Sequence, residues 1–186
     1  MTAPNLSGHL SPEDLKALVR TVPDFPHPGI QFRDITTLLL DPHGWATAIE
    51  RMVAAVSGPV DLIAGIEARG FLFAAALAAP LKAGVLLIRK DGKLPGATIA
   101  EDYALEYGTD RLEMDPGAIE PGQNVIIVDD LIATGGTALA SAELLRMAGA
   151  VISHALFVID LPDLGGAERL RAAGIKVGAL MAFEGD

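Results

Sequence analysis

Short segments that are apolar at every position alternate with helical segments over most of the chain. Residues 125–128, Val-Ile-Ile-Val, are the clearest of these segments. A strand with one face in water alternates apolar and polar residues, whereas a strand that is apolar throughout is buried on both faces. Parallel sheets covered by helices on both sides contain strands of this kind. The sequence therefore predicts an α/β fold with a parallel core sheet.

The alternation predicts a definite order of elements. We expect strands at residues 60–66, 85–88, 125–128, 155–159 and 177–183, and helices at residues 70–79, 138–147 and 167–172. Residues 90–110 have no clear period and several charges, so we expect a long loop there with room for short hairpin strands. Loops of this length inside a compact domain usually have a function.

The N-terminal region contains two helix signals separated by prolines. Residues 11–14, Ser-Pro-Glu-Asp, combine a capping hydroxyl, a first-turn proline and acids at the positive end of the helix dipole. They predict a helix that runs to about Val22. Three prolines between residues 23 and 28 exclude regular structure until Ile30. Asp41-Pro42 starts a second helix, which places four apolar side chains on one face: Trp45, Ile49, Met52 and Val53.

Length and composition limit the class of protein. The chain has 186 residues, 51% of them hydrophobic, which fits a single domain spanning residues 1–186 with a well-filled core. Its formal net charge is −10, and nucleic-acid binding rests on neutralising phosphates, so we expect no nucleic-acid partner. The longest apolar stretch, residues 71–81, is shorter than the roughly 20 residues that span a bilayer, and there is no cysteine. We expect a cytoplasmic protein with no membrane partner.

The segment after the strand at residues 125–128 has the features of a phosphate site. Five residues precede the helix expected at 138–147: Ala133, Thr134, Gly135, Gly136 and Thr137. The glycines let backbone N–H groups approach a ligand closely, the helix N-terminus favours an anion, and both threonines offer hydroxyl donors. These five residues predict a cradle for a phosphate monoester.

Asp129 and Asp130 lie between this strand and the cradle. Two carboxylates repel a phosphate, so we expect them to contact another part of the ligand. The 2′ and 3′ hydroxyls of a ribose are suitable donors to them. A ribose 5-phosphate would use the acid pair and the cradle together. The alternative for the same residues is a helix cap beside a solvated acid pair.

Three cations, Arg69, Lys90 and Lys93, follow two of the expected strands or lie in the long loop. In a chain of net charge −10, cations at these positions indicate a binding site for pyrophosphate. The alternative is that the lysines are solvated and the arginine belongs to an ordinary ion pair. The Walker loop, a different nucleotide-binding motif, is absent at residues 65–70. These residues have its glycine spacing, but Phe71 stands where the Walker loop has lysine.

Several separate motifs resemble the type I phosphoribosyltransferases, and among them the adenine phosphoribosyltransferases, over about residues 25–149. The strand, acid pair and glycine turn at residues 125–137 resemble the phosphoribosyl pyrophosphate motif of that family. The other motifs are FPHPGIQFRDIT from Phe25, GIEARGF from Gly65, RKDGKLPG from Arg89 and LEYG from Leu105. Residues 161–186 are the least similar part.

The resemblance implies transfer of the phosphoribosyl group of 5-phosphoribosyl 1-pyrophosphate to adenine, which gives AMP and pyrophosphate in purine salvage. It implies Mg²⁺ held mainly by the pyrophosphate and ribose rather than by protein ligands, a homodimer, and small molecules as the other partners. It also implies a small hood over the base, built from about residues 1–36. Two alternatives stay open: a phosphoribosyltransferase for guanine, xanthine or orotate, and a purine-sensing regulator without catalysis.

The resemblance assigns the leaving group and the proton to particular residues. Two cations would contact the pyrophosphate, Arg69 and Lys90. A cis peptide bond near Glu67-Ala68 would direct a backbone N–H at the same group. Glu106 would be the catalytic residue that accepts the proton adenine loses as its ring nitrogen attacks C1′. Asp91 departs from the neutral or basic residue usual in the family and would weaken the local field.

The resemblance places the adenine site near the N-terminus. Phe32 would stack on the purine, with Arg33 beside it. Gln31 replaces a branched apolar residue of the family, but base specificity would survive if its backbone carbonyl accepts from the adenine amino group. Leu131, after the acid pair, belongs to the same expected set of adenine contacts.

Overall fold

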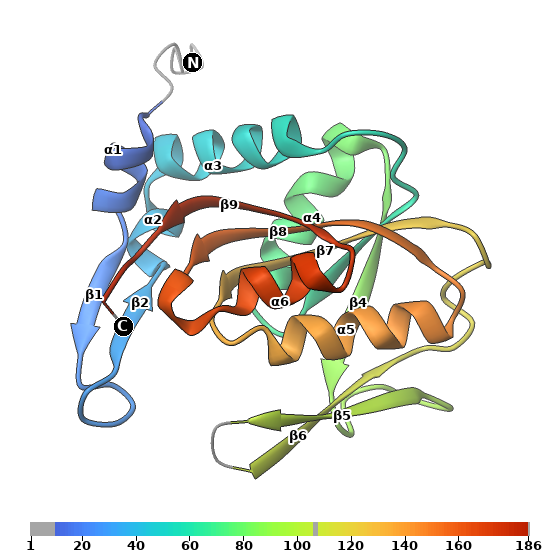
Figure 1. Ribbon diagram of the computed structural model, residues 1–186. Coiled ribbons are helices and arrows are strands. Elements are labelled where there is room, and N and C mark those ends of the chain that lie inside the picture. Colours follow the sequence, from blue (N-terminus) through green and yellow to red (C-terminus); the bar gives the residue numbers. More distant parts are fainter. Residues whose placement is uncertain (1–9, 106–107, 186) are drawn as a thin grey trace.

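The computed structural model describes residues 10–105 and 108–185 and shows a sheet between two sets of helices (Figure 1). The main sheet has the strand order β5-β6-β4-β3-β7-β8-β9. The strand bounds are β3 (Leu62–Ile66), β4 (Gly84–Lys90), β5 (Ile99–Leu105), β6 (Gly108–Met114), β7 (Asn124–Ile132), β8 (Val151–Asp160) and β9 (Lys176–Ala182). Neighbours from β4 to β9 are parallel, and β6 and β5 add an antiparallel edge. The α/β fold with a parallel core sheet is confirmed.

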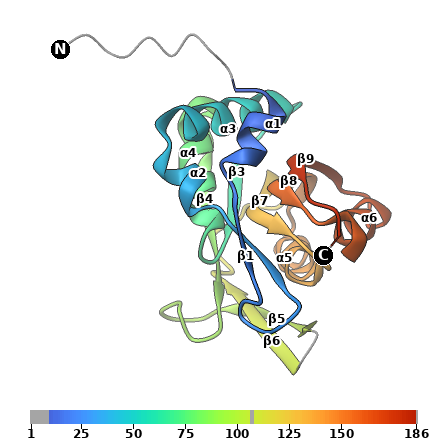
Figure 2. The ribbon, with the colours of Figure 1, turned by 90° about the vertical axis from the view of Figure 1, so that its left-hand side faces the viewer.

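Alternate side chains of β7 pack on the two faces of the sheet. Val125 and Ile127 belong to the cluster that includes residues of α5 (Gly136–Met147) and α6 (Gly166–Ala172). Ile126 and Val128 belong to the cluster that includes residues of α3 (Pro42–Ala55) and α4 (Gly70–Leu81). Figure 2 shows these two pairs of helices on opposite sides of the sheet. A strand covered on both faces must be apolar on both, which explains the run of residues 125–128.

The N-terminal helix is shorter than the sequence pattern suggests. α1 (Pro12–Ala17) has the expected N-cap at Ser11, and Asp14 completes a capping box with it. The prediction that this helix runs to Val22 was wrong, because Val22 lies in β1 (Arg20–Pro23), which pairs antiparallel with β2 (Gln31–Asp34). Thr21 and Val22 are β-branched, and such residues pack well on a pleated surface. Helix and hairpin together occupy one end of the molecule (Figure 1).

The second half of residues 90–110 contains the first strand and the start of the second strand of a hairpin. β5 pairs along its length with β6, and β6 pairs with the end of β4. Tyr103, Leu112 and Met114 are buried in the cluster that also contains side chains of α5. Charged residues stand between these apolar positions and obscure the pattern in the sequence. The hairpin strands that the sequence analysis allowed for in this segment are therefore present.

The other predicted elements are present with shifted bounds. α3 begins after Asp41, whose side chain accepts a hydrogen bond from Gly44 N at 2.7 Å. α2 (Thr36–Leu40) and a short 3₁₀ helix at Pro162–Leu164 have no counterpart among the predictions. β7 continues through the acid pair to Ile132, whereas the predicted strand ended at residue 128. Within the parts of the chain that the structure describes, no helix has the length and apolar character needed to cross a membrane.

Candidate active site

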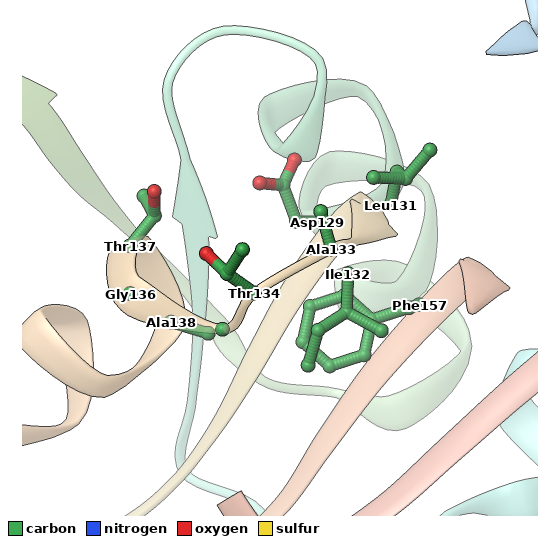
Figure 3. Close-up of a pocket in the computed structure, with 10 residues that line it drawn as sticks. Asp129, Leu131, Ile132, Ala133, Thr134, Gly136, Thr137, Ala138 and Phe157 are labelled. Carbon is green, nitrogen blue, oxygen red and sulfur yellow. The ribbon is translucent and has the colours of Figure 1, made fainter. Parts of the chain in front are cut away.

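At the carboxyl end of the central strand β7, the chain turns through residues 133–135 into α5. The carboxyl ends of parallel strands are where ligands bind in folds of this class. A cavity of about 160 Å³ lies here, and all five residues of the predicted cradle line it. Figure 3 shows Asp129, Thr134 and Thr137 around this space, which we call the cradle cavity.

Gly135 has a backbone conformation that other residues rarely adopt. Its φ is +79°, in the left-handed region, and a Cβ atom there would lie 2.9 Å from the Cα of Gly166. Gly135 is also the N-cap of α5, so the N-terminus of this helix faces the turn. A close backbone approach and a helix N-terminus together favour an anionic group such as phosphate.

The two aspartates of β7 have different surroundings, because successive side chains of a strand point to opposite faces. Asp129 lines the cradle cavity. Asp130 is only 4% exposed and forms an ion pair with Arg69, which lies just before α4. In this structure, Asp129 faces the cradle cavity, while Arg69 holds the carboxylate of Asp130.

Burial raises the pKa of Asp129 well above the ordinary value of an aspartate, and the neighbouring carboxylate of Asp130 adds to the shift. The backbone N–H of Asp130, 2.8 Å from Asp129 Oδ1, and the charge of Arg69 oppose it. Perturbed carboxylates of this kind are common at functional sites. Hydroxyl donors from a ligand would stabilise the ionised form of Asp129.

A second cavity, of about 430 Å³, is lined by Phe25, Phe32 and Arg33 of the N-terminal hairpin and by Arg69. We call it the aromatic cavity. The rings of Phe25 and Phe32 meet edge to face, with 5.2 Å between their centroids. Arg33 Nη1 donates a hydrogen bond to Thr21 Oγ1 at 2.8 Å. An apolar cavity with aromatic walls and a few polar groups is suited to a flat heterocyclic base.

The ends of β3 and β4 meet beside these cavities. The Glu67–Ala68 peptide bond is cis, as the resemblance implied. The carboxylate of Glu67 accepts hydrogen bonds from Arg89 Nε at 3.0 Å and from Lys90 N at 2.8 Å, which ties the two strand ends together. Lys90 Nζ lies 3.0 Å from Asp110 Oδ2, and this contact raises the pKa of Lys90. Lys90 is therefore a permanent cation at this edge of the sheet.

Known proteins similar to this chain identify its family. The family model described as phosphoribosyl transferase domain matches residues 39–172. The adenine phosphoribosyltransferase of Erythrobacter litoralis is 66% identical over 174 residues, which are 93% of this chain and 98% of that protein. The adenine phosphoribosyltransferase of Novosphingobium aromaticivorans is 63% identical over 177 residues, which are 95% of this chain and 99% of that protein. The chain belongs to the adenine phosphoribosyltransferase family.

Solved structures of adenine phosphoribosyltransferases share the fold. The crystal structure of the protein from Rhodothermus marinus is 47% identical, has a TM-score of 0.87, and is matched over 92% of this chain and 98% of that chain. The protein from Saccharomyces cerevisiae, crystallised with adenine and an imino-altritol bisphosphate, is 38% identical with a TM-score of 0.82, over 91% of this chain and 98% of that chain. The type I phosphoribosyltransferase core expected from the motifs is thus confirmed.

In this member of the adenine phosphoribosyltransferase family, the residues expected around adenine do not all lie together. Phe32 and Arg33 line the aromatic cavity, whereas Leu131 lines the cradle cavity. Gln31, which pairs with Pro23 in the hairpin, lines neither of these two cavities. Glu106 lies outside the described residues, so its catalytic role stays a prediction.

Three residues of the site were missed by sequence reasoning. Tyr103 is buried, and its hydroxyl donates to Asp110 Oδ2 at 3.0 Å, so both side chains lie beside Lys90. Phe157 of β8 lines the cradle cavity and lies below Asp129 in the view of Figure 3. The signal for Tyr103 and Asp110 is their pairing across the hairpin, which becomes visible only once the register of β5 and β6 is known.

Asp91, the acidic departure from the family pattern, has a cation beside it. Arg111 Nε lies 3.5 Å from Asp91 Oδ1 and its Nη1 lies 3.0 Å from Asp102 Oδ1. The side chain of Asp91 is 65% exposed, so this pair is weak in free energy. The positive charge of the Arg111 guanidinium nevertheless offsets the negative charge of Asp91, which was expected to weaken the positive field at the proposed pyrophosphate site.

No group of three or more His, Asp or Glu side chains within residues 10–105 and 108–185 is arranged to hold a metal ion. Asp129 is one carboxylate beside the cradle cavity. This donor set fits an ion that arrives on ligand oxygens and takes at most a single protein carboxylate. Mg²⁺ often binds in this way with substrate phosphates.

Proposed function

We propose that the protein transfers the phosphoribosyl group of 5-phosphoribosyl 1-pyrophosphate to adenine, giving AMP and pyrophosphate, and so salvages the purine. The observation that supports this most is the position of the acid pair between two different cavities. Asp129 lines the cradle cavity, and Arg69, the partner of Asp130, lines the aromatic cavity. A phosphorylated sugar in the first and a base in the second would meet at the end of β7.

The reaction forms one bond and breaks one bond at C1′ of the ribose. A ring nitrogen of adenine attacks C1′, and the bonding electrons to the pyrophosphate oxygen leave with pyrophosphate. Positive charge accumulates on the ribose ring before the new bond is complete. Asp129 holds the ribose through its hydroxyls, and its negative charge lies close to this developing cation.

The leaving pyrophosphate and the proton of adenine go to different residues. Lys90, held at the end of β4, and Lys93 in the following turn supply positive charge for the pyrophosphate. Arg69 would either leave Asp130 and bind the pyrophosphate, or contact Asp130 and the pyrophosphate at the same time. Mg²⁺ bound to the pyrophosphate would neutralise part of the leaving-group charge. Glu106 would accept the proton that the attacking nitrogen loses.

Choice of base separates this proposal from its nearest alternative. The named relatives are adenine phosphoribosyltransferases, and the yeast structure contains adenine. We therefore expect adenine to be used in preference to guanine, hypoxanthine, xanthine and orotate. A competition assay with equal concentrations of the free bases measures this directly, and a faster reaction with any other base would show that the substrate is wrongly assigned.

The activity itself is tested with radiolabelled adenine, 5-phosphoribosyl 1-pyrophosphate and Mg²⁺. Labelled AMP should appear, and chelation of the metal should stop its formation. A purine-sensing regulator would bind AMP or the sugar pyrophosphate without turnover. Pure protein that binds AMP and never converts adenine would therefore contradict the proposal.

The proposal includes a homodimer. An apolar groove on the α2, α3 and α4 side is lined by Leu39, Trp45, Phe71, Leu72 and Ala75, and Leu72 is 47% exposed. A second copy of the chain is the proposed occupant, since exposed apolar surface of this kind is typical of an interface. Light scattering should give twice the chain mass, and Leu72→Glu should lower it towards the monomer.

We also propose a cytoplasmic location. A chain without cysteine has no need of an oxidising compartment, and the proposed substrates are intracellular metabolites. Cell fractionation followed by an activity assay tests this. Activity found mainly in a secreted or membrane fraction would contradict it.

A further inference from the structure

The segment that leads into α6 contacts the cradle from outside the cavity. Gly166 N donates a hydrogen bond to the carbonyl oxygen of Ala133 at 3.0 Å. Arg169 Nη1 donates to the carbonyl oxygen of Thr134 at 2.7 Å. Two consecutive carbonyl groups of the turn are thus bound by residues more than 30 positions later in the chain.

These two bonds determine where the neighbouring N–H groups point. Within the described residues, the cis peptide bonds are those before Pro26 and Ala68, so the peptides after Ala133 and Thr134 are trans. In a planar trans peptide, the C=O and N–H groups point in opposite directions. With both carbonyl groups turned towards α6, the N–H groups of Thr134 and Gly135 are turned away from it. Both residues line the cradle cavity.

The contact between the two segments is made by backbone. A Cβ atom on Gly166 would lie 2.6 Å from Gly135 N and closer still to the oxygen of Ala133. The reciprocal Cβ on Gly135 would lie 2.9 Å from the oxygen of Gly166. Gly166 is buried, while Arg169 reaches the turn from the exposed side of α6. Glycine at both positions is therefore required for the turn and α6 to approach this closely.

We propose that Gly166 and Arg169 are positioning residues that turn the amide donors of the cradle towards the 5′-phosphate of the ligand. This inference rests on the proposed function, because it takes the ligand to be a ribose 5-phosphate group. Neither residue lines the cradle cavity. They act by holding the carbonyl groups of Ala133 and Thr134 on the outer side of the turn, so that the amides are oriented before the ligand binds.

The test compares Arg169→Met with Arg171→Met. Both substitutions remove one positive charge from the same helix, but Arg171 pairs with Glu168 and not with the cradle. Calorimetry with ribose 5-phosphate should show about tenfold weaker binding for Arg169→Met and little change for Arg171→Met. Arg169→Lys, which keeps a donor and the charge, should recover part of the loss. Gly166→Ala should weaken binding further, and its melting temperature shows whether it still folds.

A kinetic comparison separates positioning from a general loss of structure. In AMP formation, Arg169→Met should raise the KM for 5-phosphoribosyl 1-pyrophosphate and leave the KM for adenine and the melting temperature nearly unchanged. Equal affinity for ribose 5-phosphate in wild type, Arg169→Met and Arg171→Met would overturn the inference, as would an equal loss in both variants. If the proposed function were wrong, the wild-type protein would form no AMP. The affinities of wild type, Arg169→Met and Arg171→Met for ribose 5-phosphate could still be compared and would test the inference separately.

Discussion

At the scale of single residues, the acid pair shows how one strand can give two adjacent aspartates different surroundings. Asp130 has Arg69 as its counter-ion, so its buried charge is compensated. Asp129 has a raised pKa because it is buried next to another carboxylate. Holding Asp129 ionised costs the free protein stability, and ligand hydroxyls would recover that cost on binding.

Asp129→Asn should therefore weaken ligand binding and stabilise the free protein. Loss of a charge-assisted acceptor costs about 1.5–3 kcal/mol, or at least tenfold in affinity for ribose 5-phosphate. The pKa of Asp129 is raised in the folded state, so its stability penalty is absent below the unfolded-state pKa, near 4, and grows as pH rises above it. The melting temperature of the variant should exceed that of wild type near pH 7, and the difference should vanish near pH 4.

Calorimetry and thermal melts at the two pH values check both parts. Glu120→Gln removes one charge at an exposed position and serves as the control for net charge. A variant at Asp129 that binds ribose 5-phosphate normally would contradict the assignment to the ribose. A variant that is less stable than wild type near pH 7 would contradict the account of its pKa.

Glu106→Gln should lower kcat much more than it weakens substrate binding. Glutamine keeps the size and a carbonyl oxygen but cannot accept a proton near neutral pH. If Glu106 takes the proton from adenine, the chemical step should slow by roughly 10²–10⁴, the usual range for a positioned acid or base. Single-turnover kinetics measures that step without interference from product release. Glu101→Gln, a neighbouring acid on β5, is the control, and an unaffected chemical step in Glu106→Gln would remove this residue from the catalytic role.

At the scale of elements, the site depends on how closely α4 and the turn after β7 approach the sheet. Gly70, the first residue of α4, lies directly against β7. A Cβ atom there would be 2.6 Å from the oxygen of Val128 and 3.3 Å from Asp129 Cα. The absence of a side chain at Gly70 thus allows the helix to begin beside the acid pair.

Gly70→Ala should destabilise the protein despite the higher helix propensity of alanine. Propensity favours alanine by at most about 1 kcal/mol, whereas overpacking against backbone atoms costs about 1–3 kcal/mol or more. We expect a net loss of about 1–2 kcal/mol in urea unfolding, together with weaker binding of ribose 5-phosphate because Asp129 is displaced. Gly117→Ala is the matched control, since its Cβ would meet only Asp115 Oδ1 at 3.4 Å. Equal stability of the two variants would show that α4 can shift without cost.

At the scale of the whole molecule, a chain of net charge −10 holds its cations close to particular carboxylates. Arg20 pairs with Asp34 across the N-terminal hairpin, Arg69 with Asp130 and Arg89 with Glu67. Each of these pairs joins different elements, and the last two lie beside the site. Their carboxylates must be ionised for the pairs to form, so the fold should depend on pH in the acid range.

Asp34 is the clearest contributor to that dependence. Hydrogen bonds from the hydroxyl and the N–H of Thr36, and then from Arg20, lower the pKa of Asp34 to about 2. A lowered pKa in the folded state adds stability above the unfolded-state pKa, near 4, and that stability is lost as pH falls from about 4 to about 2. Asp34→Asn should therefore be less stable than wild type near pH 7, with a smaller difference near pH 3. Urea unfolding at both values measures this, and a difference that does not change with pH would rule out ionisation as the cause.

Much of the molecule is determined by local sequence. The runs of apolar residues and their alternation with helical segments predicted the parallel sheet, because burial on both faces leaves no polar position in a strand. The cap at Asp41, the glycines of the cradle and the order of the motifs could also be read directly. In each case the signal lies within about a dozen consecutive residues, where backbone geometry and side-chain type act together.

The tertiary structure alone decided which residues meet across the chain. The alternation of β7 put Asp129 at the cradle and Asp130 against Arg69, and the register of the hairpin brought Tyr103 and Asp110 to Lys90. Arg169 of α6 reaches the cradle from 35 positions further along the chain than Thr134. Such contacts depend on strand register and helix position, which are set by packing of the whole core. No local sequence pattern predicts these contacts, because the residues around each partner would form the same strand, turn or helix without the contact.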